Sequence, residues 1–424
     1  MKNIIKYALA ATVCSVMLSS CDLNILPNSA IAYDENGQLI QTTSNLTSLE
    51  NGMLASFRSY QRGTYVLSPE LQFDLFNASV DYDNNYGSLH KSDYNFNSGT
   101  YEPGYMWQQG YSVIKNCNII IAAADNVPDE IAAATQIVKG EAYFFRAASY
   151  LQLARQFGKH ASKAADTDLC VPLVLVFNTS ERPARATVKE VYAQIKQDLT
   201  DAASLLAGVN GAPLSYRPTI DAVNALFARY YLDMGDYTNA AAYAHKVIDT
   251  GKYELASTVE EMEDVYIYDK GTEAIMQCFA SIAEGPNGLN DWTLCQSDAT
   301  YGQCLRPYYL PTQTVIDLYE ESDLRFQTWY DNTEYVFING NYFKGEFYTF
   351  VKYWGNPLLT SSPIRNGLNA AKPLKIGEMY LIAAEAELAG NNTAAAQALA
   401  AAIAKDPSLA TYAAKDLELV NVSK

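Results

Sequence analysis

Histidine and cysteine are both scarce in this 424-residue sequence, which contains three histidines and seven cysteines. His90, His160 and His245 are too sparse to predict a metal cluster. No CxxC pair is present, so the sequence signals neither a zinc site nor a disulfide framework. Cys295 and Cys304 are close enough in the sequence to suggest a pairing, which the sequence leaves open.

Catalytic motifs are also missing. The sequence has no HExxH, no GxSxG, no phosphate-binding loop and no glycine-rich dinucleotide fingerprint. We therefore predict that the protein is not an enzyme and has no cofactor or resident metal. Its 47 acidic residues leave a glycosidase carboxylate pair open, as they would in any acidic protein.

Positive charge is the third shortage. Lys and Arg number 30 against 47 Asp and Glu, which gives a formal net charge of −17. Nucleic acids and anionic surfaces bind basic proteins, so this balance argues against both as partners.

Long apolar runs are absent after the beginning of the chain. Residues 7–18 form a mostly apolar run behind a short basic stretch, which is the pattern of a secretory signal peptide and is too short to span a bilayer. The next residues, "LSSC", resemble the lipobox of bacterial lipoproteins. We expect residues 1–20 to be a signal peptide, Cys21 to be lipidated, and residues 21–45 to be a linker. An ordinary signal sequence with a coincidental cysteine is the alternative.

Apolar residues at helical spacing dominate the body of the chain. Residues 46–60 predict a helix, and Thr187 with Glu190 forms a capping-box pattern before another. The segment "DAVNALFARYYLDMGDYTNAAAYAHKVIDTGKYEL" predicts a tetratricopeptide-like hairpin that turns at Gly235, and "KIGEMYLIAAEAELAGNNTAAAQALAAAIAKD" predicts a second. Aromatic residues within helical patterns are expected to be core: Trp107, Tyr143, Tyr150, Tyr230, Tyr231 and Tyr380.

Other segments lack this spacing. Glu273–Cys278 predicts a short strand, and Asn339-Gly340 predicts a two-residue hairpin turn between two further strands. Residues 62–106 and 281–310 are irregular and aromatic, and both are expected to form long loops. The predicted fold class is therefore mostly α, with a helical-hairpin scaffold, irregular loops and a minor β component.

Four stretches together resemble the SusD/RagB outer-membrane lipoproteins of Bacteroidetes. They are the lipobox with "CDLNILP", "GEAYFFRAASYLQLARQFG", "ALFARYYLDMGDYTNAAAYAHKVIDTGKYEL" and "PLKIGEMYLIAAEAELAG". The resemblance implies a single SusD-like ligand-binding domain over residues 46–424. The family usually continues into a further C-terminal pattern that is missing here, which leaves open a short member or a truncated chain.

The resemblance also implies a function. Such proteins are lipid-anchored at the outer membrane, face the cell surface, and act with a TonB-dependent (SusC-like) transporter. Their ligand is usually an oligosaccharide. We therefore expect glycan capture and delivery, with peptide capture as the alternative within the family. A lipid-anchored tetratricopeptide-type scaffold for protein–protein contacts is the alternative outside it.

Tyrosine, at 32 residues, is the abundant residue that suits glycan binding, since flat rings pack on sugar faces while polar groups bind hydroxyls. The family places ligand loops in an early and a later irregular region, which here carry aromatics among Gly, Asn, Asp and Pro. We expect the two regions to meet on one face, with Trp292 as the main stacking platform. The predicted ligand-binding residues are Tyr82, Asn84, Tyr86, Trp292, Tyr301, Arg306, Tyr308 and Tyr309. Residues 81–87 also partly match a calcium loop, which stays open against a plain polar loop.

Overall fold

The computed structural model describes residues 39–61, 75–78, 101–178, 180–284, 287–289, 293–298, 302–361 and 367–389. Helices make up most of this part of the chain, so the predicted mostly α fold is confirmed. The predicted signal peptide, Cys21 and most of the predicted linker lie outside the described residues. Within the described residues, none of the helices combines the length and apolar composition that a membrane span requires.

The α-helices are α2 (Thr43–Tyr60), α5 (Tyr101–Ala123), α6 (Asp129–Phe157), α7 (Val188–Leu205), α8 (Ile220–Met234), α9 (Tyr237–Ile248), α10 (Val259–Tyr266), α11 (Gln313–Ile316), α12 (Leu324–Trp329) and α13 (Ile376–Ala389). Two short 3-10 helices, η2 (Ala161–Lys163) and η3 (Pro357–Leu359), lie between them.

Local sequence fixes several of these helix ends. The Thr187 side chain accepts from the Glu190 amide, and the Glu190 carboxylate accepts from the Thr187 amide, which is the predicted capping box. Gly235 ends α8 with a φ of 72°, a left-handed conformation that glycine adopts without strain. The chain reverses there into α9, so the predicted hairpin is confirmed. Of the second predicted hairpin, α13 is described and residues 390–424 are not.

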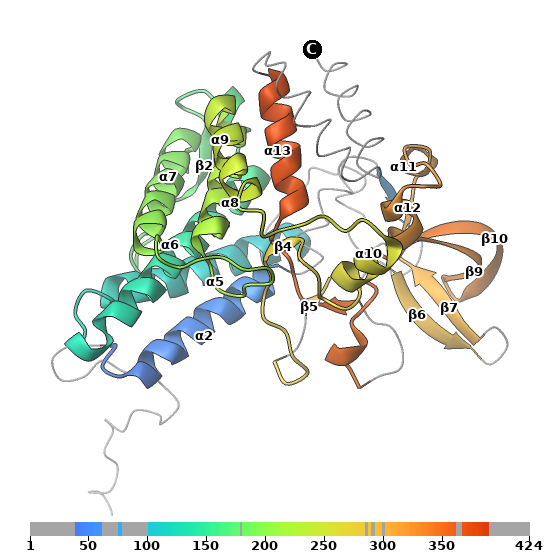
Figure 1. The fold of residues 1–424 in the computed structure, drawn as a ribbon, viewed down its shortest axis with the longest axis horizontal. Helices are drawn as coiled ribbons and strands as arrows, with labels where there is room; N and C mark the ends of the chain where they lie inside the picture. Colours follow the sequence, from blue (N-terminus) through green and yellow to red (C-terminus); the bar gives the residue numbers. More distant parts are fainter. Residues whose placement is uncertain are drawn as a thin grey trace, which may run out of the picture.

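The helices pack side by side into one body (Figure 1). α6 lies between α5 and α7, α2 packs against α5, and α9 contacts both α8 and α13. A continuous apolar core runs through them from Ile40 to Ala386. The aromatics expected in the core are confirmed there: Tyr150, Tyr230 and Tyr231 are buried, and Trp107, Tyr143 and Tyr380 are partly buried against it.

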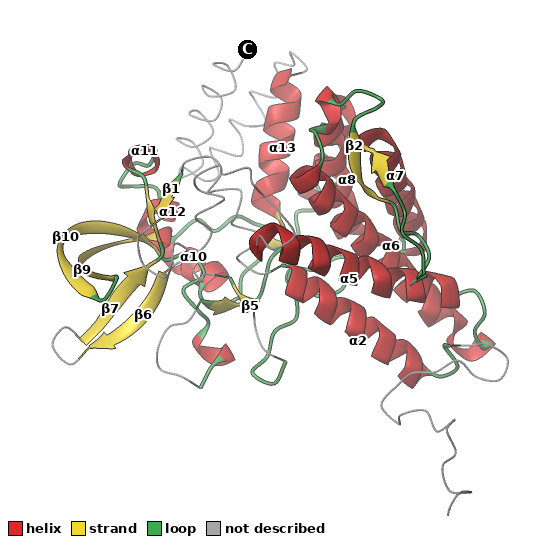
Figure 2. Ribbon diagram, turned by 180° about the vertical axis from the view of Figure 1, so that it is seen from behind, coloured by secondary structure: helices red, strands yellow, loops and turns green. Residues whose placement is uncertain are grey.

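The strands are short and mostly follow the helical body. They are β1 (Phe76–Ala78), β2 (Leu169–Pro172), β3 (Arg185–Thr187), β4 (Ala274–Met276), β5 (Asn287–Gly288), β6 (Thr293–Asp298), β7 (Gly302–Pro307), β8 (Tyr309–Pro311), β9 (Tyr330–Ile338), β10 (Asn341–Phe350), β11 (Leu368–Asn369) and β12 (Leu374–Lys375). The largest sheet has the order β10-β9-β7-β6 and projects away from α2 and α5–α9 (Figure 2). β4 confirms the predicted short strand.

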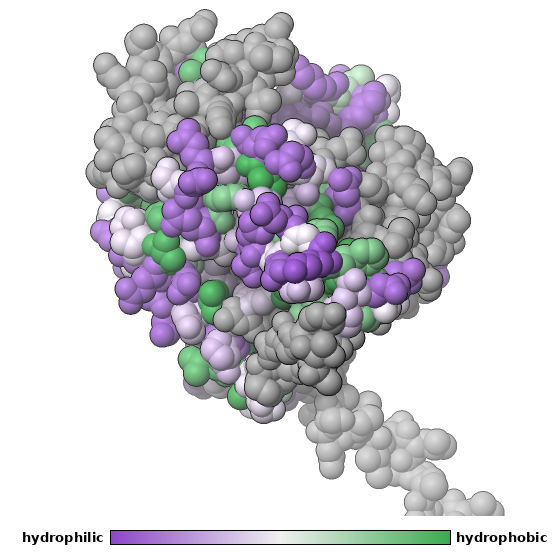
Figure 3. Space-filling view, turned by 90° about the vertical axis from the view of Figure 1, so that its right-hand side faces the viewer, coloured by the Kyte–Doolittle hydropathy of each residue, from purple (hydrophilic) through white to green (hydrophobic). Residues whose placement is uncertain are grey.

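The predicted hairpin is also confirmed. Asn339 and Gly340 connect β9 to β10 with φ values of 48° and 77°, the left-handed pair that a two-residue turn requires. The end of the molecule that carries this hairpin shows apolar patches separated by hydrophilic ones (Figure 3).

The expectation of one long loop over residues 281–310 is wrong. β6 and β7 pair along their whole length, from Thr293 opposite Pro307 to Asp298 opposite Gly302. The strand β6 reads "TLCQSD", in which apolar and polar residues do not alternate regularly. Its pairing partners therefore decide its conformation more than its own sequence does.

Candidate functional site

Three chain segments meet at the edge of the helical body and form a cleft. The Leu214 amide donates to the Ala274 carbonyl at 2.9 Å, and the Gln277 amide donates to the Ser215 carbonyl at 3.0 Å. On the other side, the Cys278 amide donates to the Ala371 carbonyl at 2.7 Å. These backbone bonds hold the segment before α8, the segment around β4 and the segment before β12 in fixed positions.

Exposed aromatic and apolar side chains surround this cleft, which has a volume of about 280 Å³. Tyr216 is 47% exposed and Phe279 is 46% exposed, and their ring centroids lie 5.9 Å apart. Tyr268 and Leu358 line the same cleft and are 37% and 67% exposed. Large apolar side chains normally lose water on folding, so this grouping favours a ligand that covers them.

The polar floor of the cleft is built around Asp269. Its carboxylate accepts from Lys372 Nζ at 2.7 Å, from Asn356 Nδ2 at 2.9 Å and from Asn369 Nδ2 at 3.2 Å. The Lys372 side chain has no exposed surface. Burial lowers the pKa of this ammonium, and the Asp269 carboxylate opposes that shift.

Backbone strain is concentrated at this floor. Leu214 and Asp269 have φ values of 63° and 56°, which residues other than glycine rarely adopt. Both line the cleft. Strained backbone persists only where the surroundings enforce it, and it is found preferentially at functional sites. The cleft is therefore rigid as well as exposed.

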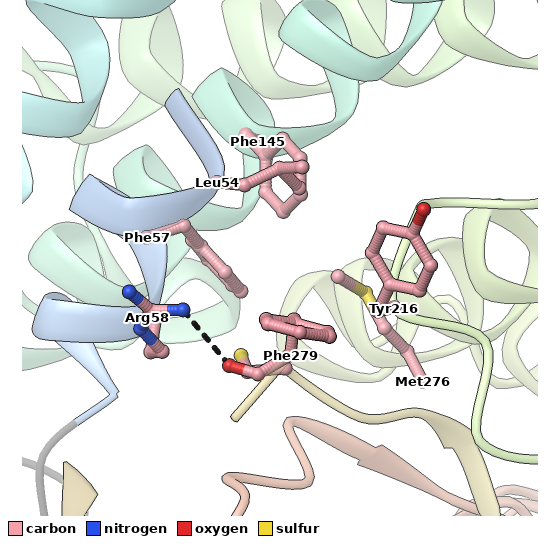
Figure 4. A pocket seen from close by; sticks show the side chains of 8 residues that line it. Leu54, Phe57, Arg58, Phe145, Tyr216, Met276 and Phe279 are labelled. Atoms are coloured by element: carbon pink, nitrogen blue, oxygen red, sulfur yellow. Dashed lines mark hydrogen bonds between the residues drawn. The ribbon is translucent and has the colours of Figure 1, made fainter. Parts of the chain in front are cut away.

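A smaller apolar pocket shares Tyr216, Cys278 and Phe279 with the cleft (Figure 4). Leu54 and Phe57 of α2 line it together with Phe145 of α6, and the Phe57 and Phe145 ring centroids lie 4.6 Å apart. Arg58 donates to the Phe279 carbonyl at 3.0 Å and to a Glu284 carboxylate oxygen at 2.8 Å. Arg58 thus ties the end of α2 to the segment that carries Phe279.

Most of the predicted ligand-binding residues lie outside the described residues. Those are Tyr82, Asn84, Tyr86, Trp292 and Tyr301, together with the possible calcium loop at 81–87. Segments that flank the two regions in the sequence are described. Gln61 and Glu284 each precede one of the two regions, and Arg58 holds these two ends of the chain close together. Farther along, Ala78 pairs with Tyr309 in the β1–β8 ladder. The meeting of the two regions on one face stays a prediction.

Tyr308 and Tyr309 correct the prediction of exposed loop aromatics. Tyr309 has no exposed surface and Tyr308 is 8% exposed. Because β8 pairs with β1, both rings join a second apolar cluster that includes Phe76, Tyr330 and Phe350. These two tyrosines hold the loop-bearing region together and present no open ring face to a ligand.

Arg306 is half-buried in β7. Its guanidinium carbon lies 5.7 Å from the centroid of the Tyr308 ring and 6.0 Å from that of Phe337. Cys304 is buried in β7, and its suggested pairing with Cys295 stays a prediction. The β6–β7 register places Cys304 opposite Gln296.

Sequence reasoning missed Tyr216 and Phe279. Tyr216 lies in "APLSYRPT", a segment with two prolines and no helical spacing. The other loop aromatics were selected because they lie among Gly, Asn, Asp and Pro, and Tyr216 meets the same criterion. Phe279 lies three residues after the end of β4 and carries no such signal. The described residues contain no group of three or more His, Cys, Asp or Glu side chains that could hold a metal ion. The exposed aromatic side chains at the cleft are suited to binding a ligand.

Comparison with known proteins identifies the fold. A family model described as SusD-like, starch-binding and associating with the outer membrane matches residues 27–232. A SusD superfamily protein from Bacteroides thetaiotaomicron VPI-5482 has a similar structure, with a TM-score of 0.70, 20% identity, and coverage of 85% of this chain and 80% of that chain. No curated protein matches the chain.

Two further solved structures have names that state a ligand. A laminarin-binding SusD-like protein matches with a TM-score of 0.66 and 20% identity over 86% of this chain and 84% of its own. A SusD-like carbohydrate-binding protein from Bacteroides vulgatus ATCC 8482 matches with a TM-score of 0.64 and 18% identity, over 86% of this chain and 75% of its own. At these identities the likeness establishes the fold.

Proposed function

We propose that this chain, which matches the SusD-like family model over residues 27–232, captures an oligosaccharide at the outer membrane and delivers it to a TonB-dependent, SusC-like transporter. The observation that carries the proposal is the exposed pair Tyr216 and Phe279 at the rim of a rigid cleft. Ring faces of this kind pack against the C–H-rich faces of pyranose rings. The laminarin-binding and carbohydrate-binding relatives support a glycan as the ligand.

Capture without catalysis fits the chemistry of the cleft. Asp269 is the carboxylate among the described lining residues, and three donors already hold it as an acceptor. A general acid or nucleophile must reach its substrate, whereas this carboxylate faces its own protein. We propose that the protein binds and releases its glycan unchanged, and that lipidation of Cys21 keeps it at the membrane surface.

The test is calorimetric titration of the purified protein against a panel of oligosaccharides, followed by Phe279→Ala and Tyr216→Ala. Each substitution should weaken binding about ten- to a hundredfold, or 1–3 kcal/mol, if the ring is a stacking platform. Tyr237→Ala is the matched control, because Tyr237 is 37% exposed at the start of α9 and does not line the cleft. Its affinity should not change.

The alternatives give different results. If the protein binds peptides and no glycan, the proposed ligand is wrong and the proposed role in nutrient capture stands. Release of sugar from a glycan would identify an enzyme and contradict the proposal. Equal losses in the cleft variants and in Tyr237→Ala would show that the effect is not local to the cleft.

A further inference from the structure

We propose that the cleft takes uncharged sugars and discriminates against glycans that carry carboxylate or sulfate groups. The inference rests on the proposed glycan capture and concerns the choice among glycans. It follows from where the charges around the cleft are placed and from which of them a ligand can reach.

The lining of the cleft is almost free of charge. Among the described residues that line it, Asp269 alone carries a formal charge, and the others are apolar, aromatic or amide-bearing. An anionic sugar would therefore meet no cation among them, since the one charge present, Asp269, is a carboxylate that is already paired with Lys372. A charged group that leaves water without gaining a counter-charge loses free energy of hydration that the cleft does not replace.

Two cations close to this lining, Lys372 and Arg58, are already engaged. Lys372 donates to Asp269 and to the Ala370 carbonyl, and its side chain is fully covered. Arg58 donates to Phe279 and to Glu284. Lys270 is exposed, and its Nζ lies 5.4 Å from the centroid of the Tyr268 ring, against a side chain of the rim.

The electrostatic field of the whole protein also disfavours acidic glycans. The whole chain has a formal net charge of −17, so the potential around it disfavours the approach of an anion. Salt screens this field over a distance of about 10 Å at 0.1 M. Any repulsion of acidic glycans should therefore weaken as salt is added, whereas stacking of an uncharged sugar should not.

The amide side chain of Gln277 supplies no counter-charge for an anion either. Gln277 donates its amide Nε2 to the Asp269 carbonyl at 3.2 Å, which turns the NH₂ group toward the protein. Its Oε1 lies beneath the surface of the cleft and has no hydrogen-bond partner within the described chain. Gln277 therefore offers an anionic sugar neither a cation nor an exposed donor.

The test compares oligosaccharides of equal length with and without uronate or sulfate groups, by calorimetry on the purified protein at about 20 mM and about 200 mM salt. The uncharged compounds should bind with nearly salt-independent affinity, and the acidic ones at least tenfold more weakly. An acidic glycan that binds more tightly than its uncharged counterpart, with affinity that falls as salt rises, would overturn the inference while glycan capture stands. Absence of binding to every glycan would overturn the proposed function and this inference with it.

A gain of function gives the sharper measurement. Leu358→Lys adds a cation at an exposed position of the lining and should raise affinity for acidic oligosaccharides about tenfold at low salt. Leu318→Lys is the matched control, since Leu318 is 41% exposed outside the cleft and its replacement adds the same charge. Equal gains in both variants would show that overall charge decides, and would overturn selection by the cleft.

Discussion

Replacing Glu141 by glutamine should stabilise the protein at alkaline pH. Glu141 lies in α6 with 1% of its side chain exposed, and its Oε1 accepts from Arg217 Nε at 2.7 Å. Its other oxygen is buried without a hydrogen-bond partner in the described chain. A second carboxylate, Glu50 of α2, lies 2.8 Å from the same Arg217 nitrogen. Two acids therefore share one guanidinium N–H group.

Burial raises the pKa of Glu141 from 4.5 to about 7, and Arg217 only partly offsets this. The folded state thus binds the proton more tightly than the unfolded state. The contribution of Glu141 to the free energy of unfolding should not change with pH below 4.5, where the group is protonated in both states. It should fall as pH rises from 4.5 to about 7 and stay constant above that. A pKa difference of this size corresponds to about 3 kcal/mol.

Glutamine cannot ionise, yet its carbonyl oxygen still accepts from Arg217. Because Arg217 is partly exposed and solvent screens the site, we expect Glu141→Gln to add about 1–3 kcal/mol near pH 8 and almost nothing near pH 5. Urea unfolding of both proteins, followed by circular dichroism at the two pH values, measures the difference. An equal loss of stability at both pH values would refute the reasoning, since it would mean that the ionised pair with Arg217 is stabilising.

Asp198→Asn is the control of opposite sign. Asp198 is also buried, but its carboxylate accepts from two Arg146 nitrogens at 2.9 and 2.7 Å and from Gln194 at 2.8 Å. Removing its charge leaves the Arg146 cation buried without its counter-charge. This substitution should therefore cost about 3–5 kcal/mol.

Three further predictions concern the anchor, the predicted loops and one turn. Cys21→Ala should move the protein out of the membrane fraction; a variant that stays there, with no lipid on the wild type by mass spectrometry, contradicts the anchor. Trp292→Ala and Tyr86→Ala should each weaken glycan binding about ten- to a hundredfold with unchanged circular dichroism, and unchanged affinity in both would remove these loops from the site. Gly235→Ala should lower the free energy of unfolding by about 1 kcal/mol because of its positive φ. Gly208→Ala is the control, because a Cβ at Gly208 would have no atom within 4 Å and the substitution should have little effect. Equal losses of stability in the two variants would rule out the positive φ of Gly235 as the cause.

Helices and turns were predictable because their signals are local. The capping box at Thr187 and Glu190, the reversal at Gly235 and the turn at Asn339-Gly340 each depend on residues within a few positions of one another. The same logic failed for β6, whose apolar and polar residues do not alternate regularly, and for β8, whose partner β1 is distant in the sequence. Tyr309 appears as a loop residue beside prolines until β1 covers it.

The sequence predicted that exposed loop aromatics would form the candidate site, but it did not identify Tyr216 and Phe279 as those aromatics. A search for aromatics among loop residues is sound, and it would have selected Tyr216 if applied to the segment before α8. Phe279 becomes part of the site only because Cys278 bonds to Ala371 and Arg58 bonds to the Phe279 carbonyl. Neither contact can be predicted from the residues close to Phe279 in the sequence.

The backbone bonds that join Leu214 to Ala274 and Cys278 to Ala371 have a consequence for folding. They close large loops of chain, whose entropic cost is met only after the helices have assembled, so the cleft should form late. A ligand seated there then holds together parts of the chain that would otherwise separate on unfolding. Binding should therefore raise the melting temperature of the whole molecule, by an amount set by ligand concentration relative to the dissociation constant.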